Sequence, residues 1–154
     1  MKLIVPMLMV GGIAALSSSP TTILVWNATA SAPIGLYAIR HAASIARGDL
    51  VLAEPPAKVR ALAAARGYLP AGVPLVKRIA ALSGDTICSS GKRVAINGRI
   101  VAMRLAEDTQ GRPLPVWHGC YRLRRDQVFL LMAQVPDSFD GRYFGPVQRA
   151  AILG

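Results

Sequence analysis

A lysine within a mostly apolar stretch is the strongest candidate for a catalytic residue in this sequence. Lys77 lies inside the run 73–82, and most of its neighbours there are aliphatic. Burial of an ammonium group in such surroundings lowers its pKa. A fall of roughly 3 units from the usual value near 10.4 would leave enough neutral amine to act as a base. Lys77 is therefore a candidate general base, and the alternative is a strand lysine whose ammonium group reaches solvent.

A serine on a restricted backbone is the second candidate. Ser31 lies close to Pro33, which fixes its own φ and disfavours the helical region for the residue before it, and to Gly35, which permits a turn. A serine nucleophile needs an adjacent base, and serine–lysine pairs are a known variant of the catalytic triad. Thr29 could offer its hydroxyl to a developing oxyanion beside the backbone N–H of Ser31. The alternative is an ordinary turn.

A third polar segment, 137–146, follows the apolar run 128–133. Asp140 and Arg142 could form an ion pair that shapes this segment, and Ser138 could form a hydrogen bond with an amine. The alternative is a surface loop whose charges are solvated.

Together these segments resemble the serine/lysine-dyad signal peptidases, and most closely the TraF-type peptidases of conjugative transfer. The resemblance covers roughly residues 27–154 and depends on several motifs that occur in the expected order. They are Asn-x-Thr-x-Ser-x-Pro-x-Gly-Leu-Tyr at 27–37, Gly48-Asp49-Leu-Val, Val76-Lys77-Arg78 with Gly84-Asp85, and Ser138-Phe-Asp-x-Arg-Tyr-Phe-Gly-Pro146. The sequence departs from the family pattern at Gly141, where relatives usually carry serine.

The resemblance implies a role for each polar residue of these motifs. Ser31 would be the nucleophile and Lys77 the general base. The oxyanion hole would be formed by Thr29 and Ser31, Ser138 would orient the lysine, and Asp140 with Arg142 would be a supporting pair. The resemblance also implies that the peptide substrate binds as an added strand, with small residues beside the scissile bond.

The function that this resemblance implies is an exported serine endopeptidase that processes a pilin precursor for conjugative transfer. The acyl-enzyme could be released to water or to an amine, which would cyclise the product. One alternative is a general type I signal (leader) peptidase, whose substrates are signal-bearing preproteins. Another is a non-enzymatic basic subunit of a secretion apparatus that binds DNA or lipid.

Length and hydropathy indicate one domain preceded by an apolar segment. The chain has 154 residues, of which 53% are hydrophobic, and this length supports one packed core. No charged residue occurs between Lys2 and Arg40, and residues 3–16 are apolar throughout. We expect residues 1–26 to form a signal or membrane-anchor segment and residues 27–154 the catalytic domain. The protein would then lie in the periplasm, associated with the inner membrane or anchored in it by residues 3–26.

The net charge of +10 allows either nucleic acid or an anionic membrane surface as a partner. The basic residues are scattered and aromatic residues make up only 6%, so the basic stripe with interleaved aromatic residues that is typical of single-strand binding is missing. We therefore expect a membrane surface and no nucleic acid as a partner.

The two cysteines, Cys88 and Cys120, are an even count that favours a disulfide in an exported domain. The alternative is a pair of buried free thiols. His41 and His118 are isolated in the sequence, so we assign neither a catalytic role, and we expect neither a metal site nor a cofactor.

The pattern of short apolar runs separated by glycine and proline predicts a mainly β fold with one short helix. The resemblance implies that this is a signal-peptidase-like β catalytic domain. The helix is predicted over 56–66, and 107–119 is expected to be a long loop. Asn97-Gly98 is a strong signal for a two-residue hairpin turn. Strands are predicted at 35–40, 49–53, 75–81, 86–88, 93–96, 99–103, 120–123, 128–133 and 146–151.

Overall fold

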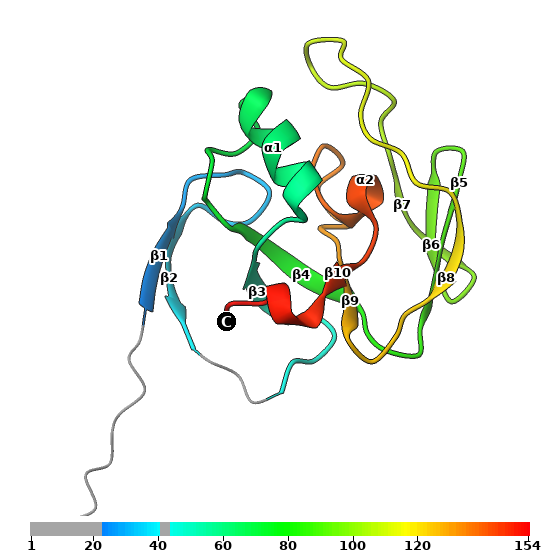
Figure 1. Cartoon of the computed structure of the whole chain (residues 1–154), viewed down its shortest axis with the longest axis horizontal. Coiled ribbons are helices and arrows are strands. Elements are labelled where there is room, and N and C mark those ends of the chain that lie inside the picture. The colour runs from blue at the N-terminus through cyan, green and yellow to red at the C-terminus, as the bar shows by residue number, and fades with distance from the viewer. Residues whose placement is uncertain (1–22, 41–43) are drawn as a thin grey trace, which may run out of the picture.

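Short antiparallel strands make up most of the protein, and a nine-residue helix covers one side of them (Figure 1). The computed structural model describes residues 23–40 and 44–154. Within these residues the strands form one two-stranded and two four-stranded sheets. The mainly β architecture predicted from the sequence is therefore confirmed.

The central sheet has the strand order β10-β9-β4-β3. Its longest strand is β4 (Leu75–Ala81), which lies between β3 (Leu50–Ala53) and β9 (Gln127–Leu130), while β10 (Val147–Gln148) pairs with the far side of β9. Because side chains alternate between the two faces of a strand, Lys77 shares its face of β4 with Leu75 and Ile79, and all three are buried. The lysine therefore projects from an interior strand.

The second sheet is a meander of three strands, β5 (Thr86–Ser90), β6 (Arg93–Ile96) and β7 (Arg99–Met103), to which β8 (Gly119–Arg122) adds beside β5. The predicted turn between β6 and β7 is present, with positive φ at both Asn97 and Gly98. An apolar core lies between this sheet and the central one. Its buried residues are Ala81, Ile87, Val94, Ile96, Ala102, Leu123, Phe129 and Leu131.

A separate hairpin is formed by β1 (Ile23–Asn27) and β2 (Gly35–Ile39) on the side of the molecule opposite the second sheet (Figure 1). Strand β1 was not predicted from the sequence, and it crosses the expected boundary between the segments 1–26 and 27–154. Most of the expected signal or anchor segment lies outside the described residues, as does His41. No described helix has the length and hydropathy needed to cross a bilayer.

The helix α1 (Ala57–Ala65) agrees with the predicted helix, but two short helices were missed. Residues 146–151, predicted as one strand, divide into β10 and the 3-10 helix η1 (Arg149–Ala151). The strand predicted over 128–133 ends at Leu130, because the N–H of Met132 donates to the Asp140 carboxylate instead of a neighbouring strand. Asp140 also caps the second missed helix, α2 (Gly141–Phe144).

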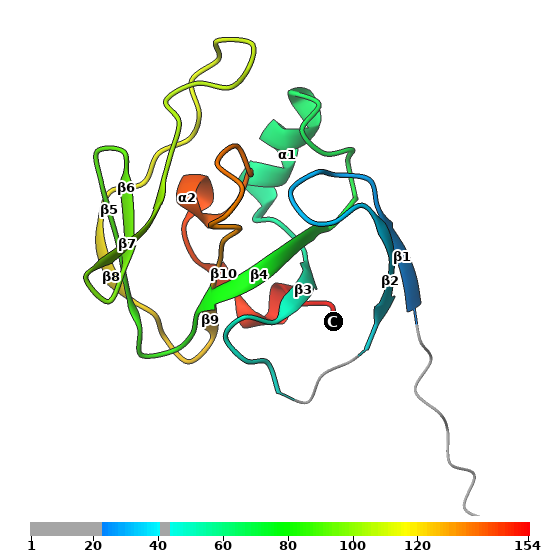
Figure 2. The same cartoon turned by 180° about the vertical axis from the view of Figure 1, so that it is seen from behind.

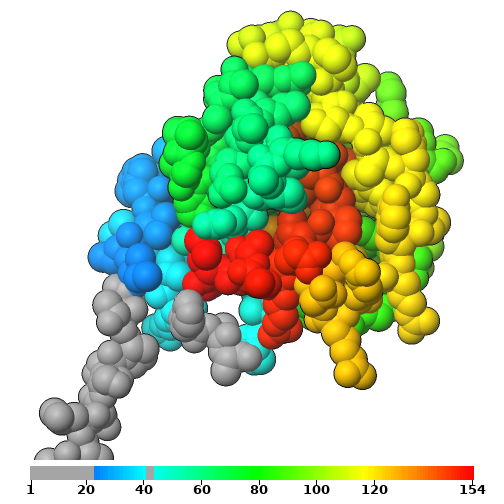
Figure 3. Space-filling view, in the orientation of Figure 1, coloured from blue at the N-terminus to red at the C-terminus, as the bar shows by residue number. Residues whose placement is uncertain are grey.

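Long-range backbone contacts complete the frame around the central sheet. The C-terminal residues run beside β3, as the view from behind shows (Figure 2). The N–H of Leu153 donates to the carbonyl of Leu52, and the N–H of Leu52 donates to the carbonyl of Gly154, both at 2.8 Å. On the face shown in Figure 3, α1 packs beside the segment that joins β7 to β8, residues 104–118.

Candidate active site

Ser31 and Lys77 lie 46 positions apart in the sequence and meet in the folded protein. Lys77 Nζ donates a hydrogen bond to Ser31 Oγ across 2.5 Å. Ser31 belongs to the loop after β1, and Lys77 is the third residue of β4. Figure 2 shows this loop beside the first residues of β4. Sequence reasoning named both residues, and the fold places them within hydrogen-bonding distance.

The surroundings of Lys77 favour its neutral form. The residue is 2% exposed, and burial lowers its pKa from 10.5 to about 8. The nearby Asp140 carboxylate opposes this change, and the Arg142 guanidinium adds to it. A pKa near 8 leaves a useful fraction of neutral amine at neutral and mildly alkaline pH.

Two polar residues before Ser31 organise its loop. The hydroxyl of Thr29 donates to Asn27 Oδ1 at 2.8 Å and lies 3.2 Å from Ser31 Oγ. The side-chain amide of Asn27 in turn donates to the backbone carbonyls of Ala32 and Pro33, both at 3.1 Å. From the sequence, Asn27 was noted only as part of a motif. Its position at the end of an apolar run, two residues before Thr29, was the signal that could have identified it.

Ser31 and Lys77 open into a pocket of about 270 Å³ with a mostly apolar lining. Most of the lining comes from four segments that are far apart in the sequence. They are the loop after β1, the start of β4, the segment 104–118 and residues 137–143. The lining residues are Thr29, Ala30, Ser31, Tyr68, Leu69, Leu75, Lys77, Leu105, Asp108, Thr109, Leu114, Asp137, Ser138, Phe139 and Tyr143.

Asp108 holds one wall of this pocket in place. Its carboxylate accepts hydrogen bonds from the Tyr68 hydroxyl and from Arg112 Nε, the latter at 2.7 Å. Arg66, at the end of α1, donates to the carbonyl of Pro113 at 2.7 Å. Burial alone would raise the pKa of Asp108, but the hydrogen bonds from Tyr68 and Arg112 hold it well below its usual range. The segment 104–118 is thereby fastened to α1 as a fixed wall.

The expected ion pair of Asp140 and Arg142 is present and buried. Arg142 Nε and Asp140 Oδ1 are 2.9 Å apart, and the two side chains are 1% and 0% exposed. A buried guanidinium needs hydrogen-bond acceptors for its remaining N–H groups, and four backbone carbonyls supply them. They belong to Met103, Met132, Val135 and Pro136. The pair therefore ties the segment that contains Ser138 to the end of β7.

Comparison with known proteins identifies the family. Residues 1–154 match the family described as signal peptidase, peptidase S26. The chain belongs to this family. Among the curated relatives, the plasmid transfer protein TraF of Escherichia coli is 38% identical over 138 residues, which cover 82% of this chain and 77% of the relative. The probable conjugal transfer protein TraF of Sinorhizobium fredii (strain NBRC 101917 / NGR234) is 39% identical over 140 residues, which cover 83% and 72%.

Among solved structures, the signal peptidase I of Enterococcus faecalis V583 matches with a TM-score of 0.42 and 21% sequence identity. The match covers 72% of this chain and 95% of the solved chain. The family assignment and the similarity to TraF proteins agree with the resemblance that the sequence motifs indicated.

Two further features of the signal peptidase motifs are visible after β9. Ser138 is buried and lines the same pocket as Lys77, but its hydroxyl forms no hydrogen bond within the described part of the chain. Its role as an orienter of Lys77 therefore stays a prediction. At Gly141, a Cβ atom would lie 2.5 Å from the carbonyl oxygen of Leu130 and 2.7 Å from the Phe129 ring. A serine side chain at this position would not fit this packing.

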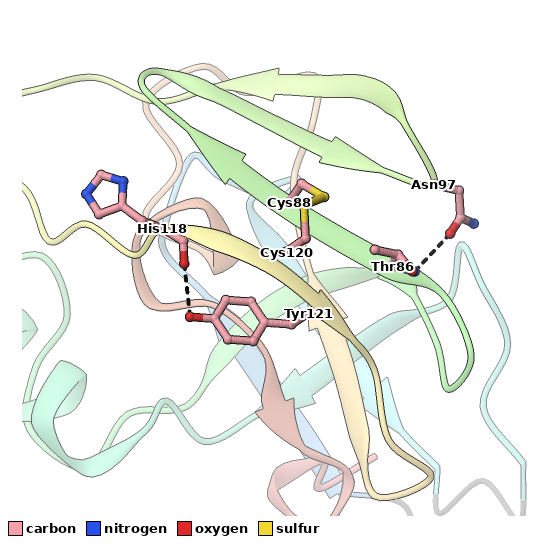
Figure 4. Close-up of a disulfide and its surroundings, with 6 residues drawn as sticks. All are labelled: Thr86, Cys88, Asn97, His118, Cys120 and Tyr121. Atoms are coloured by element: carbon pink, nitrogen blue, oxygen red, sulfur yellow. Dashed lines mark hydrogen bonds between the residues drawn. A yellow bond between two sulfur atoms is a disulfide. The ribbon is translucent and has the colours of Figure 1, made fainter.

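The predicted disulfide between Cys88 and Cys120 is present and joins β5 to β8 (Figure 4). The two cysteines face each other directly in the antiparallel register, and neither lines the pocket. His118 accepts a hydrogen bond from the Tyr121 hydroxyl through its backbone carbonyl at 2.9 Å (Figure 4). Over residues 23–40 and 44–154, no cluster of three or more histidine, cysteine or acidic residues is placed to hold a metal ion.

Proposed function

We propose that this protein is an exported serine endopeptidase that uses Ser31 and Lys77 as a catalytic dyad on a protein precursor of conjugative transfer. The observation that carries this proposal is the 2.5 Å hydrogen bond between Lys77 Nζ and Ser31 Oγ at a pocket. A buried lysine with a pKa near 8 beside a serine hydroxyl is what nucleophilic catalysis by a Ser-Lys pair requires. Membership of a peptidase family supports the same conclusion.

In this mechanism neutral Lys77 takes the hydroxyl proton as Ser31 Oγ attacks the scissile carbonyl carbon. The new C–O bond moves the carbonyl electron pair onto the oxygen. When the C–N bond then breaks, the Lys77 ammonium gives its proton to the leaving amine. Neutral Lys77 next takes a proton from the nucleophile that attacks the acyl-enzyme, and it returns this proton to Ser31 Oγ as the bond between Oγ and the carbonyl carbon breaks. If that nucleophile is water the product is a linear peptide, and if it is an amine a new peptide bond forms.

The proposed oxyanion hole consists of the backbone N–H of Ser31 and the hydroxyl of Thr29. In the free protein the Thr29 hydroxyl donates to Asn27 Oδ1. It would have to turn away from Asn27 before it could donate to an oxyanion, whereas the N–H of Ser31 needs no such rearrangement.

We assign supporting roles to the residues after β9. The unused hydroxyl of Ser138 lines the pocket together with Lys77, and we expect it to accept a hydrogen bond from the lysine once Ser31 is acylated. The buried pair of Asp140 and Arg142 holds the backbone that carries Ser138.

The proposed substrate is a pilin precursor, bound in extended form with an apolar side chain in the pocket. The similarity to proteins named for plasmid and conjugal transfer supports this substrate class. The lining supports an apolar side chain, since Leu69, Leu75, Leu105 and Leu114 all contribute to it.

We propose that the protein acts at a membrane surface on the periplasmic side, with residues 1–26 as its signal or anchor segment and residues 27–154 as its catalytic domain. The hairpin of β1 and β2 supports a membrane-facing side because it exposes large apolar side chains. They are Ile23, Leu24, Trp26, Ile34 and Leu36. The net charge of +10 favours anionic headgroups.

The proposal is tested by incubating the full-length protein in detergent micelles with candidate pilin precursors and, separately, with a leader-bearing preprotein. Mass spectrometry of the products distinguishes a linear peptide from a cyclic one, which is lighter by one water. We expect pilin cleavage by the wild type and none by Ser31→Ala or Lys77→Ala. Cleavage of the preprotein alone would indicate a general leader peptidase. No cleavage together with salt-sensitive DNA binding would indicate a basic, non-enzymatic subunit.

A further inference from the structure

One buried amide organises the turn that carries Ser31. Asn27 is the last residue of β1 and is 5% exposed. Its Oδ1 atom accepts from the backbone N–H of Thr29 at 3.1 Å and from the Thr29 hydroxyl at 2.8 Å. Its Nδ2 atom donates to the carbonyls of Thr29, Ala32 and Pro33 at 3.0, 3.1 and 3.1 Å. The amide nitrogen and the amide oxygen of Asn27 therefore both form hydrogen bonds with residues of the turn that contains Ser31.

The orientation of this amide is determined by its partners. The reversed amide would set Nδ2 against the N–H of Thr29 and Oδ1 against three carbonyl oxygens, so that each hydrogen bond would become a repulsion. Asn27 Oδ1 is consequently fixed as the acceptor that faces Thr29.

This orientation sets the direction of the hydrogen bonds that reach Ser31. A hydroxyl group has one hydrogen, and Thr29 donates its hydrogen to Asn27. Thr29 Oγ1 can therefore only accept from Ser31 Oγ, which lies 3.2 Å away. While Lys77 is protonated and donates to Ser31 Oγ, the hydrogen bonds run in one direction, from Lys77 through Ser31 and Thr29 to Asn27. Neutral Lys77 can instead accept the hydrogen of Ser31.

We propose that Asn27 is a positioning residue for catalysis. It holds the turn so that Ser31 Oγ lies against Lys77, and it holds Thr29 Oγ1 next to Ser31 Oγ in the free protein. This inference rests on the proposed role of Ser31 as the nucleophile. Asn27 itself contacts neither Lys77 nor the pocket, so its effect passes through the turn and through Thr29.

The first test replaces the amide. A displacement of about 1 Å at a reacting atom can lower the rate roughly 100-fold, so we expect Asn27→Ala to lower kcat by about 10-fold to 100-fold. KM should change by less than about 2-fold, because the residue does not line the pocket. Activity is expressed per folded molecule, with the folded fraction measured by circular dichroism.

The second test is a double-mutant cycle with Thr29→Val, which keeps the shape of the side chain and removes its hydroxyl. If Asn27 acts through Thr29, the double variant should be no worse than Asn27→Ala by more than about 2-fold. Losses that multiply would overturn the inference, since they would mean that Asn27 and Thr29 contribute independently of each other. If Asn27→Ala does not fold, a folded Thr29→Val enzyme with the wild-type kcat would overturn it as well.

Asn97 provides the matched control. Its side chain also accepts from a backbone N–H, that of Thr86, and also donates, to Asp85, but it lies at the turn between β6 and β7 (Figure 4). Asn97→Gly, which tolerates the positive φ at this position, should lower stability and leave kcat unchanged. Inactive Ser31→Ala combined with a wild-type kcat for Asn27→Ala would overturn this inference alone. An active Ser31→Ala enzyme would overturn the proposed function.

Discussion

Lys77 is the residue whose environment matters most for the proposed chemistry. It shares its face of β4 with buried aliphatic residues, and this burial lowers its pKa to about 8 despite the opposing charge of Asp140. Desolvation outweighs attraction here because the Asp140 carboxylate is itself paired with Arg142. The base is therefore produced mainly by packing and only to a lesser degree by neighbouring charges.

The pH dependence of activity follows from that pKa. We expect kcat/KM to rise with pH, with a midpoint near 8, because only neutral Lys77 can accept the proton of Ser31. Lys77→Arg should be inactive, since a guanidinium stays protonated in this range. A profile measured between about pH 6 and about pH 10 checks both statements. A flat profile, or an active arginine variant, would indicate a solvated lysine instead.

Stability should change with pH over a related window. The pKa of Lys77 is about 8 in the folded protein and about 10.4 in an unfolded chain. Between these values the unfolded state binds more protons, so the free energy of unfolding should rise with pH, by about 3 kcal/mol in total. Urea unfolding at several pH values would measure this rise. Lys77→Met should remove it, and an equal rise in that variant would show that another group is responsible.

At the scale of elements, the junction of β9 and α2 determines how residues 137–143 face the pocket. Asp140 caps α2 through the N–H of Arg142 and also accepts from the N–H of Met132. Gly141 allows the helix to approach β9 closely, since a Cβ atom at this position would meet the Leu130 carbonyl and the Phe129 ring. The Asp140 carboxylate therefore holds the residues on both sides of the junction, and the close approach of Gly141 to Leu130 fixes the helix against β9.

Gly141→Ser tests this packing. A Cβ atom would lie 2.5 Å from a backbone oxygen, which cannot move without disturbing β9, so we expect a loss of about 1–3 kcal/mol in the free energy of unfolding. The matched substitution Ala150→Ser adds the same hydroxyl group at an exposed position and should change stability by less than about 0.5 kcal/mol. Denaturant unfolding of both variants gives the comparison, and equal stabilities would show that the junction has room for a side chain.

At the scale of the whole molecule, the pocket depends on several parts of the chain that pack around β4. The β1–β2 loop supplies Ser31, the central sheet supplies Lys77, and the segment 104–118 supplies the wall fastened to α1 by Arg66 and Asp108. The second sheet supports that segment at both ends, because the segment leaves β7 and enters β8. The disulfide between β5 and β8 joins the strand after this segment to the rest of that sheet.

Removing the disulfide should destabilise the protein without abolishing the dyad. Cys88 and Cys120 are 32 positions apart, and the chain-entropy model gives about 3–4 kcal/mol for a loop of this length. We expect the Cys88→Ala/Cys120→Ala variant to lose stability of this order in non-reducing denaturant unfolding. Wild-type protein treated with dithiothreitol should match the variant. Wild-type protein whose stability does not change on reduction would show that the bridge contributes little.

The sequence by itself determined the residue types and much of the local structure. Short β-type runs, the Asn97-Gly98 turn and the nine-residue helix could all be predicted, because turn geometry and side-chain alternation are local properties. The mainly β fold and the family were also predictable, since the motifs occur in a recognisable order. The residue types, their neighbours and the family resemblance were enough to identify Ser31 and Lys77 as the candidate nucleophile and base.

Only the tertiary structure decided what depends on contacts between distant segments. Strand β9 ends at Leu130 and α2 forms because the Asp140 carboxylate accepts from the backbone N–H groups of Met132 and Arg142. Hydropathy does not reveal this competition. The role of Asn27 depends on carbonyls that turn back toward it. The lowered pKa of Lys77 depends on the packing around β4. The apolar run around Lys77 indicated that its pKa would fall, but the extent of burial and the direction of hydrogen bonds arise only once distant segments have packed together.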